Sequence, residues 1–544
     1  MIGVSASVAG TRPRLLKGRR GFSFALGAGI AAALLGAGPV HGGLPDLSPI
    51  DAVRLRQHVE VLADDAFQGR EAGGPADRKT TNYIAKALAN AGIEPGWRGK
   101  WLQPAPFIRR SAVEWRLSGQ ASGEAIEISP EALVLIGEGK VERIANAPVV
   151  FIGHGIVDPA SGRDDIGSAD LKGAVVLRFA EPPPEYAAGN RPVPDLRLRR
   201  ALYRSRGAVA DIAINDSEDA EFIRLQRGYR LGLMRLGETG PGIGVTGHVK
   251  AAAAAPVLAA AGLDLKTMRT QAAMPDFRAA TIPLRITAHV ETGIRRFRSA
   301  NVVGRLEGRG RPDEAVIVTA HWDGYGVCLP AGSPDRICNG AIDNASGIAG
   351  MIELARALKA GPAPRRSVLF VATTAEEHGL LGAEYYASHP AVPLRATVGG
   401  VNLDTIALRG RGAKLGVIGR GLTTLDPIIR DVARAQGREL LDDSSVQQYF
   451  RRSDHFALVK RGVPMVMLTG IFSREREKDD AIDRYFERDY HQPGDELEAV
   501  PSFDGAAEDV EAALAVVRWM ANADVPPRWL PNSPYQRGGG PSAP

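Results

Sequence analysis

The second half of this chain alternates short apolar runs with longer stretches of helical periodicity, and this alternation restricts the fold more than any other feature. The apolar runs are continuous, as in strands buried on both faces, and the stretches between them are long enough for crossover helices. The pattern predicts an α/β fold with a mixed, mostly parallel sheet flanked by helices. The predicted strands are 302–306, 315–320, 368–373, 398–403, 413–418 and 463–468, and the predicted helices are 346–359, 380–388, 422–435 and 503–520.

Acidic and histidine side chains follow the ends of several of these runs. Ligands bind at the carboxyl ends of strands in open α/β sheets, so side chains from separate segments are expected to meet there. Two imidazoles and three carboxylates suit a pair of Zn²⁺ ions that share one carboxylate. The candidate metal ligands are His321, Asp343, Glu377, Asp404 and His491.

Two further acids stand beside candidate ligands. Glu376 precedes Glu377, and adjacent side chains leaving a strand can diverge, so one carboxylate could bind metal while the other serves as a base for the attacking water. Asp323 is two residues from His321 and could accept the imidazole N–H that faces away from the metal. Singly, such residues are more often helix caps, surface acids or structural histidines. Their order and their places at strand ends together predict a hydrolytic metal site.

The length of 544 residues is too great for one hydrophobic core, so several domains are expected. Helical periodicity over 51–63 and 83–91 precedes a middle region of short β-like runs between loops rich in Pro and Gly. This region holds no set of candidate ligands, and we predict an inserted β-rich domain. The predicted division is a signal peptide over 1–42, the first part of the catalytic domain over 43–130, the insert over 131–285, the main catalytic domain over 286–525 and a disordered tail over 526–544.

The excess positive charge lies in the amino-terminal segment. The net charge is +5, and the segment before residue 43 contains five basic residues and no acid, so the remainder is neutral. A nucleic-acid-binding function therefore loses its main support, and no nucleic-acid partner is expected. The basic residues are Arg12, Arg14, Lys17, Arg19 and Arg20.

The same segment has the features of an export signal. Arg19 and Arg20 precede an uncharged apolar run over 24–35, shorter than the roughly 20 residues of a membrane-spanning helix. The paired arginines followed by Phe22 resemble a twin-arginine signal, although Gly18 stands where that motif usually has Ser or Thr. A general secretory signal and an uncleaved anchor are the alternatives. We predict a periplasmic or secreted protein without a stable membrane span once the signal is removed.

Cys328 and Cys338 are the only cysteines, and both fall between the first two candidate ligands. In an exported protein, a disulfide that closes this short loop is favoured over two free thiols. A role as zinc ligands is not expected, because histidines and carboxylates already complete a site.

Five stretches around the candidate ligands resemble the M28 family of zinc aminopeptidases. The segment 64–91 is also similar to that family's N-terminal helical entry, and 130–285 is similar to a protease-associated insert. The resemblance therefore extends over nearly all of the chain after the predicted signal. The five stretches are His321-Trp322-Asp323, residues 339–347, Ala375-Glu376-Glu377, Asn402-Leu403-Asp404 and Tyr490-His491-Gln492-Pro493.

The resemblance implies a di-zinc aminopeptidase that removes N-terminal residues from peptides with a free amine. In that family's pattern, Asp343 would bridge the two ions. His321 and Asp404 would complete one site, and Glu377 and His491 would complete the other. Glu376 would act as general base and then acid, and Asp323 would orient His321. The chain departs from the pattern only in the loop that carries both cysteines, which affects the rim of the site.

Three other functions are compatible with this architecture. A glutaminyl cyclase would use one zinc for an intramolecular acyl transfer, but the complete ligand set favours the two-metal hydrolase. A carboxypeptidase would need cationic groups for a substrate carboxylate, and Arg451 and Arg452 could supply them. A non-catalytic binding protein would be expected to lack ligands. Ser453, Asp454, His455 and Tyr449 lie before the last predicted strand and could line the pocket; a structural role is the alternative for His455 and Tyr449.

Overall fold

The computed structural model describes residues 48–121, 123, 125–187, 193–474, 481–531 and 533–536. The predicted signal peptide lies outside the described residues, as does the end of the chain from 537. The predicted disordered tail begins with an ordered part. Arg528 N–H donates to Thr424 Oγ1 at 3.0 Å, and the Trp529 indole N–H donates to Gly462 O at 3.0 Å.

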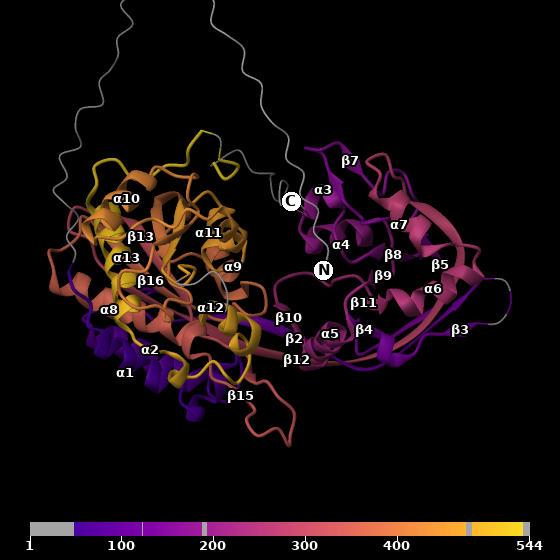
Figure 1. Ribbon diagram of the computed structural model, residues 1–544, viewed down its shortest axis with the longest axis horizontal. Coiled ribbons are helices and arrows are strands. Elements are labelled where there is room, and N and C mark those ends of the chain that lie inside the picture. Colours follow the sequence, from indigo (N-terminus) through magenta and orange to yellow (C-terminus); the bar gives the residue numbers. More distant parts are fainter. Residues whose placement is uncertain are drawn as a thin grey trace, which may run out of the picture. The chain divides into compact units, whose positions relative to one another are not determined.

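The carboxy-terminal part of the chain forms the expected sheet with helices on both faces (Figure 1). Strand β13 pairs in parallel with β16 and β17, and β17 pairs in parallel with β19, while β18 and β12 run antiparallel to their neighbours. The strands are β12 (Ala280–Leu306), β13 (Arg311–His321), β16 (Arg366–Thr373), β17 (Thr397–Asn402), β18 (Gly416–Ile418) and β19 (Met465–Thr469).

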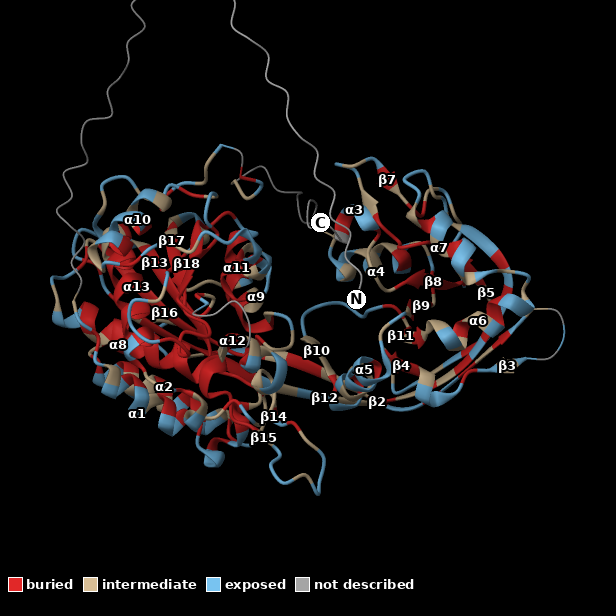
Figure 2. Cartoon of the chain, viewed as in Figure 1, coloured by how far each residue is buried: buried red, intermediate tan, exposed pale blue. Residues whose placement is uncertain are grey.

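Alternate residues of β13 belong to two separate hydrophobic clusters. Val316 and Val318 pack in the cluster that contains the apolar residues of α8 and α13, whereas Ala315 and Ile317 pack in the cluster that contains those of α9 and α11. Figure 2 shows these strands as buried. The helices of this part are α1 (Ala52–Leu62), α2 (Asp77–Asn90), α8 (Ser346–Ala360), α9 (Leu381–Ser388), α10 (Asp426–Ala435), α11 (His455–Val459), α12 (Ala481–Arg484) and α13 (Asp504–Asn522).

Most predicted boundaries lie within a few residues of those in the structure. Helix α1 begins where Asp51 accepts hydrogen bonds from the backbone N–H groups of Val53 and Arg54, as an N-cap does. Helix α10 starts at Asp426 and not at 422, because Pro427 occupies its first turn, where a missing N–H costs nothing.

The middle of the chain has more helix than its sequence suggested. Strands β5, β8, β9 and β11 form a parallel series, and β4 closes it in the antiparallel sense. The strands are β4 (Leu133–Gly137), β5 (Val141–Phe151), β8 (Val175–Phe179), β9 (Ala210–Asn215) and β11 (Val245–Lys250), and the helices are α3 (Pro184–Ala187), α4 (Leu196–Ser205), α5 (Asp219–Leu231), α6 (Ala251–Ala260) and α7 (Leu265–Ala273).

One antiparallel pair of long strands joins the middle of the chain to the rest. Strand β2 pairs with β12 from Leu102↔Val302 to Gln120↔Arg285, and β12 also pairs with β5 and β16. Because of this pair, the strands of both parts belong to one 15-stranded sheet within the described residues. The remaining strands are β1 (Glu94–Pro95), β2 (Leu102–Gln120), β3 (Ile126–Glu127), β6 (Val157–Asp158), β7 (Arg163–Asp164), β10 (Leu233–Leu236), β14 (Gly326–Val327) and β15 (Ile337–Cys338).

No single helix in the described ranges is long and apolar enough to cross a membrane. Helices α6 and α7 meet the length and composition criteria only as a pair, and they are bent by 103° with respect to each other.

Candidate metal and active site

The five candidate ligands come together at the carboxyl edge of the parallel strands. His321 is the last residue of β13, and Glu377 and Asp404 follow the ends of β16 and β17. Asp343 lies in the short turn Ala341–Ala345 before α8, and His491 follows the turn Tyr485–Asp489. Parallel strands end at one edge of a sheet, which explains how residues up to 170 positions apart meet.

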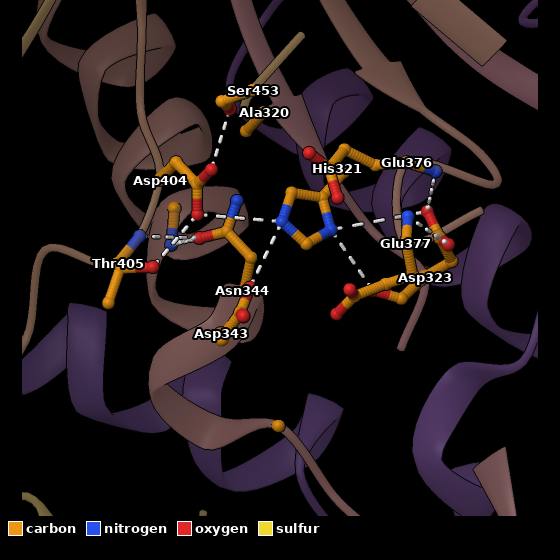
Figure 3. A network of polar contacts seen from close by, with 12 residues as sticks. Ala320, His321, Asp323, Asp343, Asn344, Glu376, Glu377, Asp404, Thr405 and Ser453 are labelled. Carbon is orange, nitrogen blue, oxygen red and sulfur yellow. Dashed lines mark hydrogen bonds and ion pairs between the residues drawn. The ribbon is translucent and has the colours of Figure 1, made fainter. Parts of the chain in front are cut away.

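Asp343 lies between the two imidazoles. His321 Nε2 is 3.1 Å from Asp343 Oδ1, and His491 Nε2 is 3.2 Å from Asp343 Oδ2. The remaining two carboxylates each contact one histidine. Asp404 Oδ1 is 3.5 Å from His321 Nε2 (Figure 3), and Glu377 Oε2 is 3.2 Å from His491 Nε2. Each histidine thus faces one oxygen of Asp343 and one further carboxylate.

The nitrogen and oxygen atoms of the candidate ligands are better arranged for binding metal ions than for hydrogen bonds to one another. Asp343 Oδ1 and His491 Nε2 are buried, yet neither has a hydrogen-bond partner among the described residues. Their close contacts lack hydrogen-bond geometry, as expected of atoms arranged around a shared cation. Burial and then the neighbouring carboxylates Asp343 and Glu376 raise the pKa of Glu377 well above its usual value. A bound cation would relieve this accumulation of negative charge.

Glu376 lies on the same edge, next to the candidate ligands. One atom each from His321, Glu376 and Asp404 lies within 4.8 Å of the others, and a second such group contains His321, Asp343 and Glu377. Burial raises the pKa of Glu376 well above its usual value; nearby Asp454 and Asp404 act in the same direction, and His321 opposes them. Its carboxyl group is therefore placed to exchange a proton near the metal ligands.

Asp323 contacts the site differently from its predicted role. Its backbone oxygen is 3.1 Å from His321 Nδ1, whereas its carboxylate Oδ1 is 4.0 Å away. The carboxylate accepts the backbone N–H groups of Glu376 at 3.0 Å and Glu377 at 3.4 Å (Figure 3). Burial raises the pKa of Asp323 to about 6. Asp323 therefore orients His321 through its carbonyl and fixes the turn that carries both glutamates.

Two hydroxyl groups hold Asp404 in place. Ser453 Oγ donates to Asp404 Oδ2 at 2.6 Å, and Thr405 Oγ1 donates to Asp404 Oδ1 at 2.9 Å. Asn344 Oδ1 accepts the Thr405 backbone N–H at 3.2 Å, which ties this turn to the residue after Asp343. Ser453 is one of the residues expected to line the pocket, whereas Thr405 was not anticipated; its position next to Asp404 was the only signal.

Asp495 was also missed, although it lies four residues after His491. Its carboxylate accepts the backbone N–H groups of Ile342 at 2.8 Å and Asp343 at 3.0 Å, and the Tyr485 hydroxyl at 3.0 Å. It thereby connects the loop of one ligand to the backbone of another. The acidic residue within the Tyr490–Glu496 loop was the available signal, but its partner could not be read from the sequence.

A fully buried arginine joins the early helical segment to the ligand loops. The Arg70 guanidinium donates to Trp322 O at 2.9 Å, Asn339 O at 2.6 Å and Gly340 O at 2.7 Å, and to Leu62 O at 2.7 Å. Burial lowers the pKa of Arg70 to about 10, although nearby carboxylates, Asp495 first, raise it. Of these carbonyls, that of Trp322 directly follows His321, and those of Asn339 and Gly340 shortly precede Asp343.

The predicted disulfide is present. Cys328 and Cys338 are bridged with a Cα–Cα distance of 5.8 Å. Cys328 directly follows β14, and Cys338 is the last residue of β15, so the bridge lies within the small hairpin that these two strands form. Cys338 Sγ is 3.4 Å from His491 O. The bridge therefore fixes the loop between the first two candidate ligands against the loop of the last one.

The ligand edge opens into a cavity of about 300 Å³. Tyr449, Phe472 and Phe486 form one wall, with ring centroids of neighbouring pairs 4.7 to 6.3 Å apart and nearly parallel planes. Arg451 and Arg452 also line it and are exposed. His455, which was also expected to line the pocket, does not line it: its side chain is fully buried beside Phe450, with ring centroids 5.2 Å apart, and burial lowers its pKa to about 4.

Imidazole and carboxylate groups arranged around one shared carboxylate, at the edge of a parallel sheet, define the class of metal-dependent hydrolases. Comparison with known proteins supports this class. Residues 301–515 match the model of peptidase family M28, a family of hydrolases.

Three relatives illustrate the match. The chain is 38% identical over 92 residues to the aminopeptidase YwaD of Bacillus subtilis (17% of this chain, 18% of that protein). It is 38% identical over 90 residues to a probable zinc metalloprotease of Leptosphaeria maculans (16% and 20%). The matched segments thus span about a fifth of these relatives. The solved aminopeptidase from Aneurinibacillus sp. strain AM-1 has the same fold, with a TM-score of 0.51 at 18% identity over 87% of this chain and 95% of that one.

Proposed function

We propose that this protein is an exported aminopeptidase that uses two zinc ions to hydrolyse the N-terminal peptide bond of its substrates. The observation that carries the proposal is the position of Asp343, whose two oxygens face His321 and His491 at 3.1 and 3.2 Å. One carboxylate between two imidazoles, each with a further carboxylate, is a donor set for two ions. The match of residues 301–515 to a peptidase family model supports hydrolysis of peptides as the reaction.

The chain's own residues supply the binding and the proton transfer. His321, Asp343 and Asp404 would hold one ion, and Asp343, Glu377 and His491 the other. Bound zinc supplies polarisation of the scissile carbonyl and a lowered pKa for the attacking water. Glu376 would accept the attacking water's proton and return it to the leaving amine, because its carboxyl group lies beside the proposed ligands His321 and Asp404.

The proposed preference for a free N-terminus rests on the chemistry of the amine. A free α-amine has a lone pair for a bound metal ion and N–H donors for the carboxylates that line the cavity, whereas an acylated nitrogen has no such lone pair. Export rests on the predicted signal over 1–42. Sequencing the N-terminus of protein recovered from the periplasm or medium tests it, and a chain that retains Met1 inside the cell contradicts it.

A carboxypeptidase is the second candidate, because Arg451 and Arg452 line the same cavity and could receive a C-terminal carboxylate. A panel of aminoacyl p-nitroanilides beside their N-acetylated counterparts separates the two functions. We expect cleavage of the free-amine substrates and at least a hundredfold lower kcat/KM for the blocked ones. Equal cleavage of blocked substrates contradicts the aminopeptidase proposal, and cleavage of N-acetylated dipeptides supports the carboxypeptidase.

A further inference from the structure

The cavity that contains the candidate metal ligands is lined by charged side chains of both signs. The carboxylates of the ligand cluster line it, and bound zinc would offset their charge. Among the described residues that line it, Arg451 and Arg452 are the only arginine or lysine side chains. Within the described part of the chain, neither guanidinium lies within 4.0 Å of a carboxylate, so both retain donors for a ligand.

The backbone that carries both arginines is fixed to the ligand cluster, because they directly precede Ser453, whose hydroxyl is bonded to Asp404. The Arg452 guanidinium lies over the ring of Tyr449, which lines the cavity, at 5.3 Å. Arg451 lies over the Phe456 ring at 5.6 Å and donates to the Tyr535 hydroxyl at 3.3 Å, and neither of these partners lines the cavity. Arg452 is therefore the better placed of the two to meet a ligand.

A planar guanidinium fork matches carboxylate and phosphate groups, and of these two a peptide carries carboxylates. At about 300 Å³ the cavity is at the lower end of the range for small-ligand pockets, so a ligand that fills it is short. A short peptide bound in this cavity therefore lies against both the ligand cluster and the lining arginines.

We propose that Arg451 and Arg452 bind a carboxylate of the substrate and make the enzyme selective for acidic or very short peptides. This inference rests on the proposed peptidase function. The carboxylate can be the C-terminus of a dipeptide or the side chain of an N-terminal Glu or Asp, and the two sources are separated by experiment.

Two matched substrate pairs test the inference. Ala-Ala is compared with Ala-Ala amide, and Glu p-nitroanilide with Gln p-nitroanilide. We expect the carboxylate member of one pair to be favoured by about tenfold in kcat/KM, mainly through KM, because charge-assisted hydrogen bonds at an exposed rim contribute at this level. The pair that shows the preference identifies the source of the carboxylate.

The double variant Arg451→Met/Arg452→Met should reduce that preference to less than about twofold. The matched control, Arg430→Met/Arg434→Met, removes the same charge from exposed positions on α10 and should retain it. Should the double variant fail to fold, Arg452→Lys keeps the charge without the fork and should weaken the preference. A wild-type chain without preference in either pair, or a double variant that keeps it, overturns the inference.

Binding measured without turnover separates this inference from the proposed function. Calorimetric titration of the zinc-loaded Glu376→Gln chain should show about tenfold tighter binding of the favoured carboxylate peptide than of its neutral partner. Equal affinities overturn the inference even if wild-type protein hydrolyses every substrate. Failure to hydrolyse any of the four substrates, with selective binding intact, instead contradicts the peptidase function and leaves the carboxylate site supported.

Discussion

Glu376 and Glu377 are neighbours in sequence, yet their side chains have different surroundings. Glu377 Oε2 contacts His491 at 3.2 Å, whereas Glu376 groups with His321 and Asp404. Asp323 accepts both of their backbone N–H groups and so fixes the turn from which the two side chains diverge. The assignment of one glutamate as ligand and the other as base follows from this divergence.

Glu376→Gln tests the assignment. Glutamine keeps the size of the side chain but cannot accept and return a proton, so kcat should fall by about 10²–10⁴-fold. Zinc content should stay the same, because the proposed ligands are untouched. Activity against an aminoacyl p-nitroanilide and zinc by mass spectrometry are the two measurements. Wild-type kcat in the variant contradicts the role, and loss of zinc reassigns Glu376 as a ligand.

At the scale of elements, Arg70 joins the segment after α1 to the loops of two ligands. Four backbone carbonyls depend on its guanidinium, and all lie in buried positions around it. Asp495 has a similar role, because its carboxylate links the His491 loop to the Asp343 backbone. The loops of the candidate ligands are thus held by charged groups that are not candidate ligands themselves.

Arg70→Met should destabilise the protein and weaken metal binding together. Each buried carbonyl left without a donor costs about 1–3 kcal/mol, so a loss of roughly 3 kcal/mol or more is expected. The melting temperature should fall by several degrees, and chelator competition should show weaker zinc retention. Arg54→Met, at an exposed position on α1, is the control. A variant with wild-type melting temperature and zinc affinity would show that Arg70 does not stabilise the loops of the candidate ligands.

The sheet of the peptidase part was predictable because its strands are continuous apolar runs buried on both faces, such as β13 and β16. The candidate ligands were predictable because they follow the ends of these runs. The roles of Arg70 and Asp495 were not predictable, because their partners include backbone groups up to 270 residues away. Thr405 carried no signal beyond its place next to Asp404. Helices α4 and α5 of the middle region were missed because they are rich in charge and gave no apolar runs.

At the scale of the whole molecule, the middle region contributes a pH-sensitive group remote from the ligands. His154 is buried, its Nδ1 lies 2.7 Å from Glu181 O, and its Nε2 has no partner among the described residues. Burial lowers the pKa of His154 to about 4. The folded protein therefore binds fewer protons here than the unfolded chain, and stability falls as the pH drops from about 6.5 toward 4.

His154→Gln should make the protein less sensitive to acid. Between pH 7 and pH 5, protonation linked to His154 lowers the free energy of unfolding of the wild type by about 2 kcal/mol, and the variant does not have this loss. The melting temperature of the wild type should therefore fall more over this interval than that of the variant, while His289→Gln, at a partly exposed site, should behave like the wild type. An equal fall in melting temperature between pH 7 and pH 5 for His154→Gln and the wild type contradicts the prediction.

The central claim is that two zinc ions share Asp343, and zinc content per chain tests it most directly. After zinc loading and exhaustive dialysis, the wild-type chain should hold two zinc ions, measured by mass spectrometry against protein concentration. Asp343→Ala should hold fewer than one, because both ions lose a ligand. A single zinc in the wild type, or two zinc ions retained in Asp343→Ala, would contradict the account.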